Sequence, residues 1–346
     1  MKKKGANTII DIADALGISP STVSRALKDH PHISQETKDK VKKQAAKLGY
    51  RHNALAASLR KSKSNTIGLI VPRISMYFQS AVITAIQNTL RESGYNLIIC
   101  QSNDSYALEV ELVNALYSSR VEGVIVSTTL YTTDFSHFDI FLKNNIPLVF
   151  YDRVPKNYPA LIIKGDDYKG GYLAAEHLIG QGCRRIAQIG GPLTCNLYED
   201  RCAGFKDALK KHKIKLDKSI VFFHELTWEN ALKDCERIFS QKPWPDAVFA
   251  LNDTSAIAVL EYARKLRLKV PRDLKVMGYS NDPRAVIIMP QLTTVEQFPA
   301  EVGEKAAKGV IGLITQKASL KRTPPPIITP IRLIERQSSV VENASR

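Results

Sequence analysis

Residues 8–27 predict two short helices joined by a tight turn, a pattern that few other folds can accommodate. Thr8 can cap the first helix, with Asp11 three residues on completing a capping box. The apolar residues that follow are spaced to share one buried face: Ile9, Ile12, Ala13 and Leu16. Gly17 supplies the left-handed residue that ends a helix. The first helix therefore has a start, a buried face and an end.

The second predicted helix begins with Ser19 as its cap and Pro20 at its first position, where the missing N–H costs nothing. Its apolar residues, which pack back on the first helix, are Val23, Ala26 and Leu27. Its polar side carries Ser21, Thr22, Ser24 and Arg25. Such a helix fits the major groove of double-stranded DNA, and the predicted contacts are Thr8, Ser19, Pro20, Ser21, Thr22, Ser24 and Arg25. An ordinary helical hairpin with a polar outer face is the alternative.

The charge distribution favours a nucleic-acid partner over a plain hairpin. Residues 1–64 carry 14 Lys and Arg against 5 Asp and Glu, whereas the whole chain of 346 residues has a net charge of +15. More than half of the excess therefore lies in the first fifth of the chain, and Lys2 to Lys4 form a basic arm. Such a concentration is typical of a module that neutralises DNA phosphates.

A third helix is predicted from Ser34, its cap, to a terminating Gly49, and three helices make a minimal core. The alanine-rich segment from Asn53 to Leu59 is too short to be a stable helix alone, so it should form only when a partner orders it. The polar stretch over 61–65 is typical of a linker.

From Thr66 onward the pattern is that of parallel sheets covered by helices. Runs of the buried-strand type are Ile67–Val71, Leu97–Cys100, Val124–Ser127, Leu148–Tyr151, Ile186–Ile189, Val221–Phe223, Ala247–Leu251 and Lys275–Tyr279. Helices are predicted near 78–92, 106–119, 137–144, 168–180, 201–212, 229–240 and 254–267. The fold class is thus α/β, with two similar halves behind a helix-turn-helix head.

Ligands of open parallel sheets lie beyond the carboxyl ends of the strands, and several polar and aromatic residues occupy those positions. The predicted effector contacts are Tyr77, Phe78, Asp152, Arg201, Trp228, Asn252, Asp253 and Ser280. Aromatic rings that stack on a sugar ring, and Arg and Asp groups that bond its hydroxyls, suit a sugar-like ligand. Five of them also have a plainer interpretation: the three aromatic residues as core, Asp152 as part of a structural turn, and Asp253 as a helix cap.

Enzymatic chemistry finds little support in the sequence. The five cysteines form no C-x-x-C pair, and their odd number suits a reducing cytoplasm better than a disulfide framework. A nucleophilic Cys195 or Cys202 beside the predicted ligand site is the remaining enzymatic alternative. There is no phosphate-binding glycine loop, no cofactor is expected, and no apolar stretch reaches the roughly 18 residues of a membrane span. We therefore expect a cytoplasmic protein without a metal site.

The chain resembles the LacI/GalR family of bacterial transcription regulators, above all in residues 8–27, in Leu48-Gly49-Tyr50, in the segment from Asn53 to Leu59 and in the strand from Thr66. The resemblance implies that hinge segments of two subunits fold on DNA and insert Leu59 into the minor groove. It adds Asn53 and Ala56 to the DNA contacts. The sequence departs from the family pattern at His52, Ala57 and Ser280.

The resemblance also implies a domain plan. The head spans 1–52 and the hinge with its linker 53–65. A periplasmic-binding-protein-like core spans 66–338, with a first lobe over about 66–164 and 295–322 and a second lobe over about 165–294 and 323–338. A tail follows over 339–346.

Together these features predict an effector-controlled homodimeric repressor of carbohydrate genes that binds a pseudo-palindromic operator. An activator or dual regulator, and a sugar receptor or enzyme with a basic head, are the alternatives.

Overall fold

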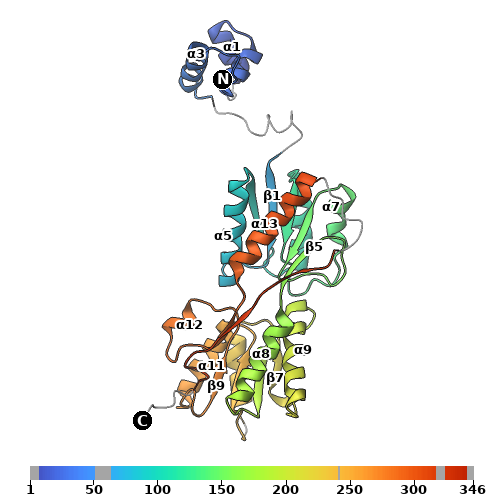
Figure 1. Cartoon of the computed structure of the whole chain (residues 1–346), viewed down its shortest axis with the longest axis vertical. Coiled ribbons are helices and arrows are strands. Elements are labelled where there is room, and N and C mark those ends of the chain that lie inside the picture. Colours follow the sequence, from blue (N-terminus) through green and yellow to red (C-terminus); the bar gives the residue numbers. More distant parts are fainter. Residues whose placement is uncertain (1–7, 51–63, 241, 317–323, 341–346) are drawn as a thin grey trace, which may run out of the picture. The chain divides into compact units, whose positions relative to one another are not determined.

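The structure is a computed structural model that describes residues 8–50, 64–240, 242–316 and 324–340 (Figure 1). The chain divides into two compact units, residues 1–64 and residues 65–346. The basic arm at Lys2 to Lys4 and the hinge positions named above (His52, Asn53, Ala56, Ala57 and Leu59) lie outside the described residues. Among the helices of the described chain, none combines the length and the apolar character that a membrane span needs.

The head contains the three predicted helices α1 (Ile9–Leu16), α2 (Pro20–Leu27) and α3 (Gln35–Lys47). The capping box at the start of α1 is confirmed: Thr8 N donates to Asp11 Oδ2 at 2.6 Å, and Asp11 N donates to Thr8 Oγ1 at 3.4 Å. Gly17 adopts φ +62° after α1, a conformation that glycine takes without a steric penalty. These local signals fix the path of the chain through the turn.

The core of the head is small and consists of interior residues from all three helices. They are Ile12, Ala13, Val23, Ala26, Val41 and Ala45. Half-buried neighbours such as Leu16, Leu27 and Leu48 close its edges. Because these side chains are short, the three helices pack closely enough for so few residues to exclude water.

The first lobe of the second unit is a six-stranded parallel sheet in the order β11-β5-β4-β3-β1-β2 (Figure 1). Its strands are β1 (Thr66–Val71), β2 (Asn96–Gln101), β3 (Gly123–Val126), β4 (Leu148–Tyr151), β5 (Leu161–Gly165) and β11 (Ile327–Thr329). Helices α5 (Tyr77–Glu92) and α13 (Pro299–Gln316) cover one face. The other face is covered by α6 (Tyr106–Ser118), the short helix η1 (Ser136–Phe138) and α7 (Asp139–Lys143).

Two expectations about this lobe were wrong. The β2 segment was predicted to be buried, but it forms one edge of the sheet, and Ile98 and Ile99 are 38% and 40% exposed. The return to the second lobe was placed at about residue 323, but β11 pairs with β5, with Ile327 opposite Ile163, and belongs to the first sheet. Both errors concern the order of the strands in the sheet. The hydrophobic pattern of a single strand does not show which strands lie beside it.

The second lobe holds a four-stranded parallel sheet in the order β7-β6-β8-β9. Its strands are β6 (Ile186–Gly190), β7 (Val221–Phe223), β8 (Ala247–Ala250) and β9 (Lys275–Met277). One face packs against α8 (Asp167–Gly180) and α9 (Asn196–Lys211), and the other against α10 (Trp228–Ile238) and α11 (Asp253–Lys265). Two short elements, η2 (Lys218–Ile220) and α12 (Arg284–Ile287), complete the lobe.

An antiparallel ribbon of β10 (Thr294–Glu296) and β12 (Arg332–Ile334) accompanies the passages between the lobes. The chain also crosses between β5 and α8. The predicted tail begins too early, because Ser339 is fully buried and its hydroxyl contacts His177 Nε2 at 2.7 Å. Packing of the second lobe therefore continues past residue 338.

Helices α8 and α9 cross at unusually short range because glycines lie at the crossing. A Cβ on Gly171 would lie 1.9 Å from the carbonyl oxygen of Arg201, and a Cβ on Gly204 would lie 1.9 Å from that of Tyr168. Backbone atoms cannot yield as a flexible side-chain end can, so these two positions exclude any side chain.

Gly204→Ala should therefore destabilise the second lobe by about 2–3 kcal/mol or more, because the methyl group forces α8 and α9 apart. Gly180→Ala is the matched control, since nothing lies within 4 Å of its Cβ position, and it should be neutral or stabilising by up to about 1 kcal/mol. Urea unfolding of the two variants checks this. Equal stabilities would contradict the close crossing.

Candidate functional site

The exposed face of α2 is the first candidate site, and its hydroxyl groups form a connected cluster. Ser19 Oγ accepts the N–H of Thr22 at 3.1 Å and contacts Ser21 Oγ at 2.7 Å and Thr22 Oγ1 at 2.9 Å. The start of the helix is therefore ordered by its own side chains. Small groups at this position permit close approach of the helix to a base edge or phosphate.

Arg25 lies one turn further along α2 and is exposed. Within the described part of the chain it has no ion-pair partner, whereas Lys40 and Lys42 on α3 are paired with Glu36 and Asp29. A guanidinium group that the head does not use internally is available for a bidentate contact with guanine or phosphate. The head thus places the predicted contact residues of α2 at its surface, except that Thr22 and Ser24 are half-buried.

The second candidate site is a small pocket between the two lobes, which we call the central pocket. It brings together five of the predicted effector contacts: Phe78, Asp152, Arg201, Asn252 and Ser280. The first two belong to the first lobe and the other three to the second, and all lie at or just beyond carboxyl ends of strands, as expected for this kind of sheet. The volume is about 40 Å³, little more than one water molecule occupies.

Arg201 is positioned by the crossing of α8 and α9. It lies in the second turn of α9, not at the start of the helix predicted near 201–212, because α9 begins at Asn196 without a capping side chain to mark its start. Its Nε donates to Asp167 Oδ1 at 2.8 Å, and its Nη1 donates to Leu251 O at 3.0 Å. The guanidinium carbon lies 3.6 Å from the centre of the Tyr279 ring.

This buried pairing gives Arg201 a structural role beside its place in the pocket. Both partners are almost fully buried, with side chains 4% and 2% exposed. Removing the guanidinium would leave Asp167 as an unpaired buried charge, at a cost of about 3–5 kcal/mol. An alanine at residue 201 would therefore weaken the lobe as well as the pocket.

Asp152 faces Arg201 from the first lobe, in a left-handed conformation with φ +60°. Gln79 Nε2 donates to its Oδ2 at 3.1 Å, and Tyr151 OH donates to Gln79 Oε1 at 2.5 Å. Burial raises the pKa of Asp152 to about 6, and Asp167 adds to the shift, while Arg153 and Arg201 oppose it. The carboxylate is therefore a strong acceptor that titrates close to neutral pH.

Three predicted effector contacts do not line the central pocket. Tyr77 is half-buried at the start of α5, and burial, with Glu296 and Asp282, raises its pKa. Trp228 begins α10 and lines a separate hollow with Ile257 and Leu260 of α11.

Asp253 is the third. Its Oδ2 accepts the N–H of Asp282 at 2.7 Å, and its Oδ1 accepts Thr294 Oγ1 at 2.6 Å, so it fastens the segment after β9 and the ribbon strand β10. The capping role considered for it belongs to Asn252, whose Oδ1 accepts the N–H of Ser255 at 2.8 Å.

Sequence reasoning missed two amides of the pocket, Gln79 and Gln297. Ser280, one of the residues at which the sequence departs from the family pattern, donates its Oγ hydrogen to Gln297 Oε1 at 2.9 Å. This bond ties residue 280 to the segment that passes between the lobes. Both glutamines are nearly fully buried. A glutamine inside a helix or after a short strand carries no motif, so only the fold reveals it.

A chain of charges connects the two lobes beside the central pocket. Arg153 Nη1 pairs with Asp104 Oδ1, and Asp104 Oδ2 accepts Arg73 Nε at 3.0 Å. Arg73 Nη2 then donates to Glu225 Oε1 of the second lobe at 2.6 Å. Opposite charges alternate along this chain, so Arg153 brings no net charge to the pocket.

Metal binding and thiol chemistry are not supported by the geometry. The described residues contain no group of three His, Cys, Asp or Glu side chains that is arranged to hold a metal ion. Burial raises the pKa of Cys195 to about 11 and that of Cys202 to about 12, so both thiols remain protonated near neutral pH. A protonated thiol is a poor nucleophile.

The raised pKa of Asp152 predicts a pH dependence of stability. Between the unfolded value of 3.8 and the native value of about 6, the native state binds more protons than the unfolded state. Stability should therefore rise as the pH falls from about 7 towards 4, and Asp152→Asn should reduce this rise. Urea unfolding at several pH values checks this against the exposed control Glu111→Gln. A slope unchanged by Asp152→Asn would contradict it.

Comparisons with known proteins identify the family of the chain. The family of bacterial regulatory proteins, lacI family, matches residues 8–53, and the periplasmic binding protein-like domain matches residues 175–339. The ribose operon repressor of Bacillus subtilis (strain 168) is 31% identical over 97% of this chain and 99% of its own length. The HTH-type transcriptional repressor PurR of Vibrio atlanticus (strain LGP32) is 30% identical over 91% of this chain and 94% of its own.

Solved structures confirm the predicted fold. The lac repressor dimer bound to operator and the anti-inducer ONPF superposes with a TM-score of 0.86 at 23% identity, covering 97% of this chain and all of the other. A LacI family transcriptional regulator from Enterococcus faecium with bound ribose gives a TM-score of 0.71 at 26% identity, covering 79% and 98%. The chain therefore belongs to the lacI family of bacterial regulatory proteins and is a DNA-binding transcriptional regulator.

Proposed function

We propose that the chain represses carbohydrate-utilisation genes and that a sugar-like effector in the central pocket controls its operator affinity. The observation that carries this proposal is that both lobes contribute to the wall of the central pocket. Gln79 and Asp152 come from the first lobe, and Arg201 and Asn252 come from the second. At about 40 Å³ the pocket is too small for a sugar in the arrangement seen here, so a sugar held by both sets requires the lobes to lie further apart and has a different affinity for each arrangement. Differential affinity is what allows a ligand to shift a conformational equilibrium.

The charges of the pocket favour an uncharged, hydroxyl-rich effector. Arg201 is balanced by Asp167, and Arg153 by Asp104, so a phosphate or carboxylate would find no unpaired cation. The remaining Asp152 carboxylate and the two glutamine amides suit sugar hydroxyls, which both donate and accept. Two similar proteins support a sugar-like effector: a repressor of a ribose operon, and a LacI family regulator whose structure contains bound ribose.

We propose that the regulator works as a homodimer in the cytoplasm, where its operator is found. Two apolar surfaces of the core support the dimer. The second lobe exposes Ile287 and Met289 by 76% and 78%, after an already exposed Val286, and the first lobe exposes Ile98 and Ile99 on β2. Grouped apolar side chains at a surface are typical of an interface. The structurally similar lac repressor binds its operator as a dimer.

Operator binding is tested at Arg25. A two-fold dimer presents two α2 helices, so the operator should be a pseudo-palindrome with half-sites about one helical turn apart. Arg25→Ala should weaken operator binding by about 1–3 kcal/mol if the residue contacts a base. Lys40→Ala, which removes an exposed cation paired with Glu36, is the control and should have a smaller effect. Equal losses on operator and random DNA would reduce Arg25 to a phosphate contact.

Coupling between the two sites is tested by a pair of titrations. Sugars from a panel are titrated into the free protein and into the protein–operator complex. The two dissociation constants should differ by about 5-fold to 150-fold, and the sugar must change operator affinity by the same factor. Asp152→Asn should weaken the sugar and leave operator affinity without sugar unchanged. Identical constants in both titrations would refute effector control.

A further inference from the structure

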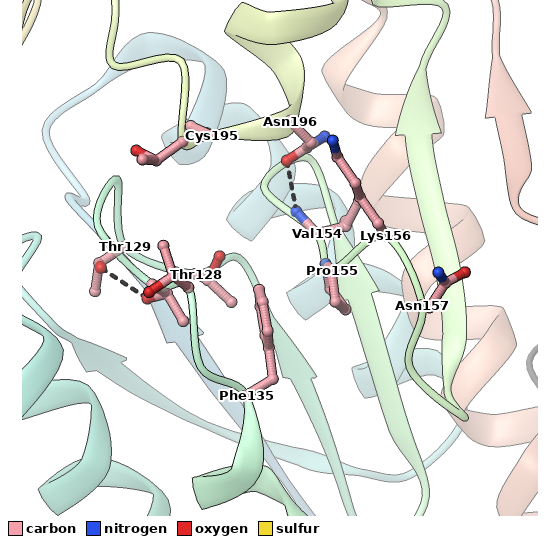
Figure 2. A pocket seen from close by; sticks show the side chains of 12 residues that line it. Thr128, Thr129, Phe135, Val154, Pro155, Lys156, Asn157, Cys195 and Asn196 are labelled. Atoms are coloured by element: carbon pink, nitrogen blue, oxygen red, sulfur yellow. Dashed lines mark hydrogen bonds between the residues drawn. The ribbon is translucent and has the colours of Figure 1, made fainter.

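A second, larger cavity lies beside the central pocket, between the lobes, and nothing described so far uses it. Its volume is about 320 Å³, which reaches the lower limit of about 300 Å³ for small-molecule sites. Figure 2 shows Cys195 and Asn196 of the second lobe facing Thr128, Thr129 and Phe135 of the first. We call it the threonine cavity, because Thr128, Thr129, Thr132, Thr133 and Thr194 line it.

Hydrogen bonds hold the wall of this cavity in place. The carboxylate of Glu109 is fully buried behind it; its Oε2 accepts the N–H of Thr129 at 2.9 Å, and its Oε1 accepts Thr132 Oγ1 at 2.8 Å. His137 Nε2 contacts the same Oε1 at 3.1 Å. From the second lobe, Thr194 Oγ1 donates to Leu130 O at 3.2 Å. The cavity is thus formed before any ligand enters.

Three of the five threonine hydroxyls of the wall have already committed their hydrogens. Thr128 Oγ1 donates to Arg153 O at 3.2 Å, Thr132 Oγ1 donates to Glu109, and Thr194 Oγ1 donates to Leu130 O. A hydroxyl has one hydrogen and two lone pairs, so what remains for a ligand are acceptor lone pairs. A ligand that matches this wall must supply O–H or N–H donors.

The charge of the wall narrows the ligand class further. Among the described residues that line the threonine cavity, Lys156 is the charged one, and its Nζ is paired with Glu199 Oε2 at 2.8 Å. An anionic ligand would be repelled by the lone pairs of the threonine hydroxyls, and a cationic ligand would find no carboxylate in the described part of the lining. Both kinds of ligand are therefore disfavoured. Phe135 offers the apolar ring surface on which the C–H face of a sugar packs.

The cavity is separated from the central pocket by a bonded wall. Asn196 at the start of α9 joins the lobes there: its Oδ1 accepts the N–H of Val154 at 2.9 Å, and its Nδ2 donates to Asp152 O at 3.1 Å. A small ligand on one side therefore does not occupy the other. Because residues of both lobes line the cavity, an occupant also favours the arrangement of the lobes seen here.

We propose that the threonine cavity is a second binding site, which takes an uncharged, hydroxyl-rich small molecule such as a polyol or a monosaccharide. It is a site separate from the central pocket, because the bonded wall at Asn196 lies between the two. The proposal does not depend on operator control, since binding can be measured without DNA.

Calorimetric titration of the full chain tests this with ribitol and D-glucose as uncharged probes and D-glucose 6-phosphate as the charged comparison. The double variant Thr133→Trp/Asn157→Trp fills the cavity from two exposed positions, and Asn114→Trp on α6 is the matched control outside it. An uncharged probe should bind the wild type and Asn114→Trp alike, and it should still bind Asp152→Asn, in which the central pocket is altered. It should bind the double variant at least about tenfold more weakly, and the phosphate should bind the wild type at least about tenfold more weakly.

Three results would overturn the proposal. One is that neither uncharged probe binds the wild type. Another is that the double variant binds like Asn114→Trp. The third is that Asp152→Asn abolishes all binding, which places the probe in the central pocket alone and leaves the proposed effector control intact. A loss of coupling to the operator, by contrast, would refute effector control without affecting the binding measured in the threonine cavity.

Discussion

The close crossing of α8 and α9 is the constraint on which the second lobe and its half of the central pocket depend. Gly171 and Gly204 let the two backbones meet, and this contact brings Arg201 on one helix to Asp167 on the other. Because the pair is buried, the two side chains hydrogen-bond to each other and not to water. Tyr279 stacks on the guanidinium group of Arg201. A pocket group placed in this way keeps its orientation when the lobes move.

The pairing of the buried arginines with aspartates determines which ligands the central pocket suits. Arg201 and Arg153 each have an aspartate partner, and the second of these pairs continues through Arg73 to Glu225 across the lobes. The cations of the pocket are therefore already paired within their own lobes, and the Arg73–Glu225 pair joins the two lobes. An uncharged effector acts on such a site through hydrogen bonds and shape, which are sensitive to the spacing of the lobes.

The sequence was most informative where structure is local. The caps at Thr8 and Ser19 depend on residues three positions away, so the head could be predicted almost completely. The positions of Phe78, Asp152 and Asn252 at the central pocket followed from the rule that ligands lie beyond strand ends. Trp228 failed because the orientation of a residue at the start of a helix depends on the helix packed beside it, here α11. The partner of Arg201 and the edge position of β2 depend on tertiary contacts that spacing does not encode.

The pairing of β11 with β5 has a consequence for how the chain is made. The sheet of the first lobe includes residues 327–329, and α13, which covers one face of it, spans Pro299–Gln316. During synthesis the strands β1 to β5 leave the ribosome long before these segments, with most of the second lobe translated in between. The first lobe must therefore wait with an uncovered face and an unpaired strand edge, a situation in which chaperones protect nascent chains. In this architecture the lobe that begins first is completed only after most of the other lobe has been translated.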